Sequence, residues 1–330
     1  MRVGIARARP PDAAILGRVS SSAPPPSAPQ KAPPPSSNGP SNGVAWLAAG
    51  AILLVVLAVV WRVRQEEGAA AAQGSVVRVE ARAEQPVRPR ERGSAPEALR
   101  VNVVRRLPHD PGAFTQGLLV HPDGRVFEST GLNGRSSLRE VALETGVVAR
   151  QRDVDARYFA EGLAAVGDRL LQLTWQDGVA FEYDLESFTP RRELHYEGEG
   201  WGLCYDEPNA RLVMSDGSAT LTFRDPQSFE SVGTARVTRQ GRAQRMLNEL
   251  ECVDGAVYAN VWQTDELVRI DPQTGHVTAV INARGLLTAE ELRFADVLNG
   301  IAYLPASGHF LITGKEWPAM FEVTFEPSAP

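Results

Sequence analysis

A short motif, a Gly or Glu followed by an aliphatic residue, recurs every 40 to 51 residues through the C-terminal two thirds of this 330-residue chain. Each copy is followed by a turn signal such as "VGDR" or "VDG" and then by further short apolar runs. Four short strands per repeat at this period are typical of a β-propeller blade. The copies are Gly117-Leu118, Gly162-Leu163, Gly202-Leu203, Glu249-Leu250 and Gly300-Ile301. They predict an all-β fold, a five-bladed β-propeller.

The last repeat is short, because the chain ends soon after "MFEVTF". Stacked repeats bury their apolar faces only when each has a neighbour on both sides, so the ring must close. We expect the segment "ALRVNVVRRLP", residues 98–108, to supply the missing outer strand of the last repeat. A catalytic propeller domain would then span residues 99–327.

Two sets of positions in the repeats carry polar or aromatic residues where a buried strand would carry Val or Ile. The first set, two residues before the aliphatic member of each motif, is Gln116, Glu161, Trp201, Asn248 and Asn299. The second set, twelve residues after it, is Thr130, Trp175, Ser215, Trp262 and Thr313. The start of one hairpin strand lies beside the end of its partner. Both sets should therefore meet at one rim of the central channel.

That rim would combine one carboxylate, three indoles, carboxamides and the ammonium of Lys315, with Phe114 and Phe159 just before the first two repeats. Each residue alone has a structural alternative: a Trp can pack, a Glu can be solvated, and an Asn can bond to a turn. An aromatic cavity with a few convergent polar groups is, however, the usual form of a small-ligand site. The shared register favours such a site.

The N-terminal third has a different composition. Residues 1–43 are rich in Pro and Ser and are predicted to be disordered. Residues 44–63 form an apolar run long enough to span a bilayer as a helix, with a cleaved signal segment as the alternative. Residues 64–98 read as a linker. We expect a membrane-anchored protein with a cytoplasmic N-terminus and an extracytoplasmic catalytic domain.

Charge and cysteine content limit the other options. The formal net charge is -6 and no basic patch stands out, so nucleic acid is not an expected partner. The only cysteines, Cys204 and Cys252, show no zinc-ligand spacing. We expect them to be two buried thiols rather than a disulfide, and we expect a monomer.

Several segments of residues 100–326 resemble, in order, the glutaminyl-peptide cyclotransferases of the plant and bacterial type. They are "FTQGL", "FAEGL", "LTWQDG", "GWGLCYD", "SDGS", "LNELE", "NVWQTD", "LNGIAY" and "TGKEWP". The resemblance implies a five-bladed propeller and no catalytic metal. Ala160 stands where some relatives have a larger residue, which affects the wall of the pocket rather than the chemistry.

The resemblance also implies site residues. The catalytic residues would be Glu161, Asn248 and Lys315, and the substrate-binding residues would be Phe114, Gln116, Phe159, Trp175, Trp201 and Trp262. No metal ligand is expected and no cofactor is needed for catalysis, although a structural divalent cation could occupy the central channel. The substrates would be peptides or proteins that begin with Gln.

The expected reaction converts the N-terminal glutamine to pyroglutamate and releases ammonia. Glu161 would take a proton from the α-amine and give one to the leaving nitrogen. Lys315 and Asn248, as donors, would stabilise the carbonyl oxygen, and Lys315 would lower the pKa of Glu161. Gln116 would bond to the substrate.

Two other functions are compatible with the same residues. A metal-dependent lactonase-type propeller could use Glu161, Asn248, Asn299 and Asp216 around an ion. A non-catalytic binding module would also present an aromatic pocket, but it would not require one carboxylate facing one lysine.

Overall fold

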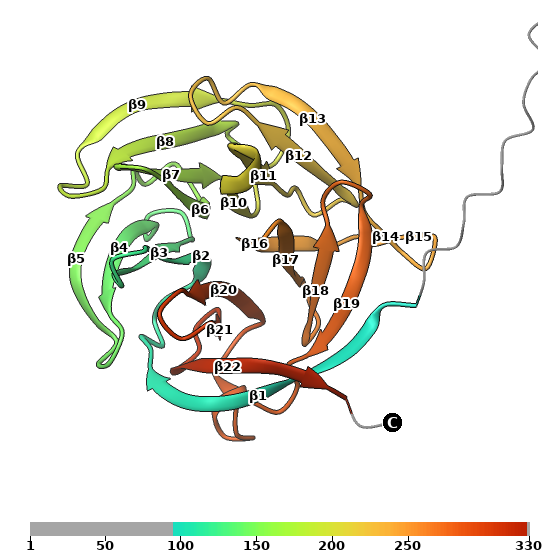
Figure 1. Ribbon diagram of the computed structural model, residues 1–330. Coiled ribbons are helices and arrows are strands. Elements are labelled where there is room, and N and C mark those ends of the chain that lie inside the picture. The colour runs from blue at the N-terminus through green and yellow to red at the C-terminus, as the bar shows by residue number, and fades with distance from the viewer. Residues whose placement is uncertain (1–94, 329–330) are drawn as a thin grey trace, which may run out of the picture. The chain divides into compact units, whose positions relative to one another are not determined.

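The computed structural model describes residues 95–328. This part of the chain is built almost wholly of β-strands (Figure 1), with two short 3-10 helices, η1 (Glu207–Asn209) and η2 (Glu291–Arg293). The all-β prediction is therefore confirmed.

Three of the sheets are four-stranded antiparallel meanders in which each strand pairs with the next in sequence. The first contains β2 (Thr115–Val120), β3 (Val126–Thr130), β4 (Ser137–Ala142) and β5 (Val147–Asp153). The second contains β6 (Ala160–Val166), β7 (Arg169–Thr174), β8 (Val179–Asp184) and β9 (Pro190–His195). The third contains β10 (Leu203–Asp206), β11 (Arg211–Met214), β12 (Thr220–Arg224) and β13 (Ser231–Arg236).

The remaining strands form one sheet, because the first strand of the domain joins two meanders. One meander is β16 (Leu247–Val253), β17 (Ala256–Val261), β18 (Glu266–Asp271) and β19 (His276–Asn282). The other is β20 (Leu298–Leu304), β21 (His309–Gly314) and β22 (Ala319–Pro327). Two short strands, β14 (Thr238–Arg239) and β15 (Arg242–Ala243), pair beside β19.

Strand β1 (Glu97–Pro108) joins the two ends of the domain. It runs antiparallel to β22, from Leu99 opposite Pro327 to Pro108 opposite Ala319, and its first residues pair in parallel with β19. Figure 1 shows β1, in cyan, alongside β22, in red. The prediction that residues 98–108 supply an outer strand to the last repeat is confirmed, and the strand begins at Glu97, inside the stretch expected to be linker.

The innermost strands β2, β6, β10, β16 and β20 contact one another in cyclic order around a common centre (Figure 1). The recurring Gly permits this close approach. A Cβ added to Gly117 would lie 2.6 Å from the backbone nitrogen of Leu163, and one added to Gly162 would lie 2.6 Å from that of Leu203. Apolar side chains fill the space between adjacent sheets; Phe127 and Leu163, for example, belong to one buried cluster.

In the fourth repeat Glu249 stands where other repeats have Gly. Its carboxylate is fully buried and accepts hydrogen bonds from the backbone nitrogens of Leu118 and Ile301, 3.2 and 2.7 Å away. A glutamate at the start of this strand therefore bridges the innermost strands β2 and β20. Burial raises the pKa of Glu249 well above its ordinary value.

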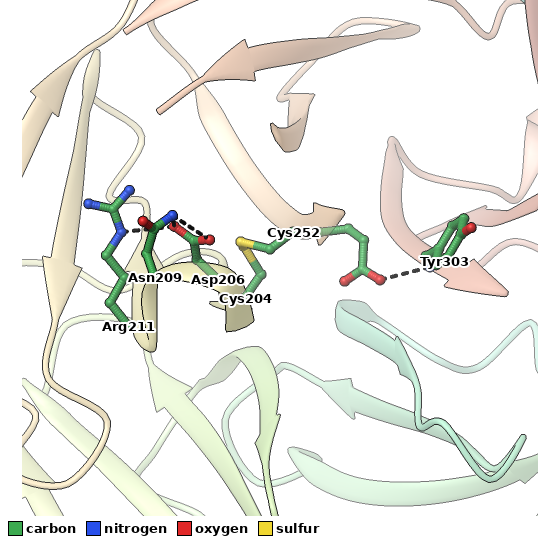
Figure 2. Close-up of a disulfide and its surroundings, with 7 residues drawn as sticks. Cys204, Asp206, Asn209, Arg211, Cys252 and Tyr303 are labelled. Atoms are coloured by element: carbon green, nitrogen blue, oxygen red, sulfur yellow. Dashed lines mark hydrogen bonds and ion pairs between the residues drawn. A yellow bond between two sulfur atoms is a disulfide. The ribbon is translucent and has the colours of Figure 1, made fainter. Parts of the chain in front are cut away.

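The expectation of two free thiols is wrong. Cys204 on β10 and Cys252 on β16 form a disulfide with a Cα–Cα distance of 5.5 Å (Figure 2). The cause is the close approach of neighbouring innermost strands, which brings the two side chains face to face. The bond lines a cavity that also contains Asp206 and Glu251 and shares no residue with the candidate site described below.

The predicted disordered region, membrane span and most of the linker lie outside the described residues. Within residues 95–328, no helix has the length and apolar character needed to cross a bilayer.

Candidate active site

All nine residues that the resemblance assigned to the site line a single cavity of about 240 Å³. They are Phe114, Gln116, Phe159, Glu161, Trp175, Trp201, Asn248, Trp262 and Lys315. The structure therefore brings all nine side chains together at one cavity.

Hairpin geometry places these side chains. Gln116, Glu161 and Asn248 lie near the start of three innermost strands, while Trp175 and Trp262 come just after the ends of the strands that pair with two of them. Backbone hydrogen bonds of 2.8 Å tie Trp175 to Phe159 and Trp262 to Met246. The end of each second strand is thereby held beside the start of the first.

The other rim positions have a structural role. Ser215 donates its hydroxyl to the carbonyl of Asn248 and accepts from the backbone of Gly202. Thr130 and Thr313 bond within their own sheets, Thr130 to Ser137. Of the five residues that follow the second strand of each repeat, only Trp175 and Trp262 therefore line the cavity.

Glu161 is 5% exposed and accepts a 2.9 Å hydrogen bond from the side-chain amide of Gln116. Burial raises the pKa of Glu161 well above its ordinary value, and the charge of Lys315 opposes this only in part. Lys315 lowers the pKa of this carboxyl as expected, but desolvation outweighs the attraction and the net shift of the pKa is upward.

Lys315 is also buried, and burial lowers its pKa, while Glu161 and Asp296 act in the opposite direction. Its ammonium lies 4.7 Å from the ring centre of Phe114, within the range of a cation–π contact. Hydrogen bonds between the backbones of Lys315 and the Asp296–Val297 segment hold the loop that presents it.

The apolar wall of the cavity consists of aromatic rings in edge-to-face contact. Phe159 meets Phe114 at 6.0 Å and Trp175 at 5.7 Å between ring centres. On another part of the wall, Trp201 and Trp262 meet at 5.4 Å. Such pairs stabilise a fixed ring arrangement, so the cavity has a defined shape before any ligand enters.

Asn248 lines this cavity and carries an unsatisfied group. The residue is buried, and its Oδ1 has no hydrogen-bond partner among the described residues. A buried acceptor without a partner is costly for the folded state. The role of its side-chain NH2 group as a donor stays a prediction.

Asn299, the fifth polar rim residue, does not line the cavity. Its amide donates to the side-chain oxygen of Gln116 at 3.2 Å and to the carbonyl of Thr115 at 2.9 Å. It therefore orients Gln116, whose own amide nitrogen then faces Glu161. Asp216, the fourth residue of the lactonase alternative, accepts from the backbone of Ser218 and is not part of the cavity wall.

Sequence reasoning missed Glu199, which accepts hydrogen bonds from the indoles of both Trp175 and Trp201. Its position two residues before Trp201, in "GEGW", was the available signal. In residues 95–328 no group of three or more His, Cys, Asp or Glu side chains is placed to hold a metal ion.

The fold and the cavity together define an all-β protein with an aromatic cavity that contains one buried carboxylate and one buried ammonium. A family model for glutamine cyclotransferase matches residues 71–325. The chain belongs to the glutamine cyclotransferase family.

Two relatives agree with this assignment. A glutaminyl-peptide cyclotransferase of Arabidopsis thaliana is 41% identical over 234 residues, which cover 69% of this chain and 72% of the relative. The crystal structure of Myxococcus xanthus glutaminyl cyclase is 41% identical, with a TM-score of 0.64, and the match covers 71% of this chain and 100% of that one.

Proposed function

We propose that this protein is a glutaminyl-peptide cyclotransferase that converts the N-terminal glutamine of peptides and proteins to pyroglutamate and releases ammonia. The observation that carries the proposal is the single buried carboxylate of Glu161 in an aromatic cavity that also contains Lys315 and Asn248. The names of the two relatives support the same reaction.

The first task of the site is to fold one residue of the substrate back on itself, because the α-amine must reach the side-chain carboxamide. A cavity of about 240 Å³ is of the size of one residue, and its aromatic walls offer few competing hydrogen bonds. Trp175, Trp201 and Trp262 would hold the glutamine side chain in a near-attack conformation.

Glu161 is the proposed proton carrier. The α-amine nitrogen forms a bond to the side-chain carbonyl carbon and loses one proton to the carboxylate. The same proton then passes to the amide nitrogen, the carbon–nitrogen bond breaks, and ammonia leaves. The overall reaction therefore yields the pyroglutamyl peptide and ammonia and consumes no water. The raised pKa of Glu161 suits this role, because it makes the carboxylate a stronger base toward the amine and lets the carboxyl hold the proton until the leaving nitrogen takes it.

Lys315 and Asn248 would act on the reacting group. The ammonium of Lys315 would stabilise the oxygen that becomes negative in the tetrahedral intermediate, a contribution of about 3 kcal/mol for a well-placed donor. The side-chain NH2 group of Asn248, which lines the cavity, would donate a second hydrogen bond to the same oxygen. Gln116, bonded to Glu161 on one side and Asn299 on the other, would position the carboxyl rather than test the substrate.

The described domain is proposed to be a five-bladed propeller. Five innermost strands in cyclic contact, each starting a meander, support this, as does the pairing of β1 with the last meander. Membrane attachment through residues 44–63 and an extracytoplasmic catalytic domain also stand as proposals. The Cys204–Cys252 disulfide supports the extracytoplasmic location, because disulfides persist in oxidising compartments.

The reaction can be tested with the full chain and two peptides of one sequence beginning with Gln, of which one is N-acetylated. The free peptide should yield equal amounts of ammonia and pyroglutamyl peptide, and the acetylated peptide should yield neither, because its amine cannot attack. Failure of the free peptide to release ammonia would refute the proposed function.

A further inference from the structure

Glu199 lies in the loop between β9 and β10 and connects two parts of the aromatic wall. One oxygen, Oε2, accepts hydrogen bonds from the indole nitrogens of Trp175 at 2.8 Å and Trp201 at 2.9 Å. The other oxygen accepts from the side-chain amide of Gln176 at 3.0 Å. Glu199 does not line the cavity, so its effect on a ligand must pass through the rings it holds.

The indoles need such a partner. Trp175 follows the end of β7 and is 37% exposed, so its edge-to-face contact with Phe159 restrains the ring less than full burial would. An indole has one donor, the ring N–H, and that donor fixes the ring when it meets an acceptor. Hydrogen bonds to an ionised carboxylate are roughly twice as strong as neutral ones, and a single oxygen here fixes two rings.

Glu199 is ionised at neutral pH. Burial acts to raise its pKa, but the hydrogen bonds from Trp201, Gln176 and Trp175 outweigh that effect and lower it. The negative charge also reaches Glu161, whose pKa it raises.

We propose that Glu199 is a positioning residue of the active site, which holds Trp175 and Trp201 in the orientation that forms the wall of the substrate cavity. The effect on substrate binding rests on the proposed cyclisation, whereas the hydrogen bonds of Glu199 can be measured without an activity assay. Glu199 thereby couples two walls that come from different sheets, since Trp175 follows β7 and Trp201 precedes β10.

Three variants separate the roles of the carboxylate. Glu199→Ala removes the acceptor from both indoles. Glu199→Gln keeps one oxygen for the two indoles and removes the charge, because the amide of Gln176 can turn to meet the new NH2 group. Gln176→Ala is the matched control, since it removes the third donor and leaves both indole bonds in place.

For a Gln-peptide, Glu199→Ala should raise KM about tenfold, the equivalent of one hydrogen bond to a charged group. Glu199→Gln keeps an acceptor for both indoles and loses only the charge, so it should change KM by less than about threefold. It should also move the acid limb of kcat/KM to lower pH, because Glu161 loses a negative neighbour. The ionisable groups that act on Glu161 are Lys315, Glu199 and Tyr196. Gln176→Ala should match the unaltered protein in both respects.

A second readout is independent of turnover. In protein carrying 15N-labelled tryptophan, the indole N–H resonances of Trp175 and Trp201, assigned through Trp→Phe variants, should shift in Glu199→Ala and stay in place in Gln176→Ala. Unchanged indole resonances in Glu199→Ala, or a KM within twofold of the unaltered protein, would overturn the positioning role. If the unaltered protein released no ammonia, the proposed function would fail, and the indole resonances would still decide the role of Glu199.

Discussion

The disulfide offers a prediction whose size follows from the chain itself. Cys204 and Cys252 are 48 residues apart, and closing a loop of that length in the unfolded chain removes conformational entropy worth about 4 kcal/mol at 25 °C. The double variant Cys204→Ala/Cys252→Ala should therefore lose about 4 kcal/mol of unfolding free energy, with about 2 kcal/mol as the lower end of the usual range. Alanine suits the position because Cys204 is buried and a hydroxyl there would need a partner.

The assay is urea unfolding followed by tryptophan fluorescence, run on the unaltered protein with and without reductant and on the double variant. Reduction should lower the unfolding midpoint of the unaltered protein and leave that of the variant unchanged. kcat/KM of the folded variant should be preserved, because the disulfide and the candidate site line different cavities. Two free thiols in the unfolded, unreduced protein, or a loss below about 1 kcal/mol, would refute the reasoning.

Three further predictions concern single residues. Lys315→Met should lower kcat by about 10²- to 10³-fold, because a donor to the developing oxyanion is lost. It should also move the acid limb of kcat/KM to higher pH, since the cation that lowers the pKa of Glu161 is gone; an unmoved limb would contradict this. Trp262→Leu should raise KM about three- to tenfold through loss of the edge-to-face contact with Trp201, and an unchanged KM would remove Trp262 from the cage. Gly162→Ala should lower the unfolding free energy by about 1 to 3 kcal/mol, measured by urea unfolding, because its Cβ would meet the backbone of Leu203; full stability would contradict the close approach of β6 and β10.

The repeat allowed much of the fold and site to be predicted from sequence. Alternation of strands and turns fixed the register of each hairpin, and register alone brings Gln116, Glu161, Trp175 and Trp262 to one rim. The missing strand of the last repeat could be located because an unclosed ring would expose apolar surface.

Other features depend on distances that a repeat pattern does not contain. Cys204 lies one residue after the aliphatic member of its motif and Cys252 lies two residues after, so the alignment gave no reason to pair them. Their pairing depends on how β10 and β16 lie against each other, which the spacing within each repeat does not set.

The pKa of Glu161 could not be predicted for a related reason. The sequence showed the neighbouring charge of Lys315, whereas the degree of burial depends on how tightly the aromatic rings close around the carboxyl. The role of Glu199 was also missed, because its bonds join two loops whose separation only the folded chain sets.

The central claim is that the carboxyl of Glu161 moves the proton in ring closure, and the Glu161→Gln variant tests it most directly. Glutamine keeps the size of the side chain and can still bond to Gln116, so the urea unfolding curve should show a folded protein. Ammonia release from a Gln-peptide should fall by about 10²- to 10⁴-fold, the usual contribution of a general acid–base group. Release at the rate of the unaltered protein would contradict the mechanism.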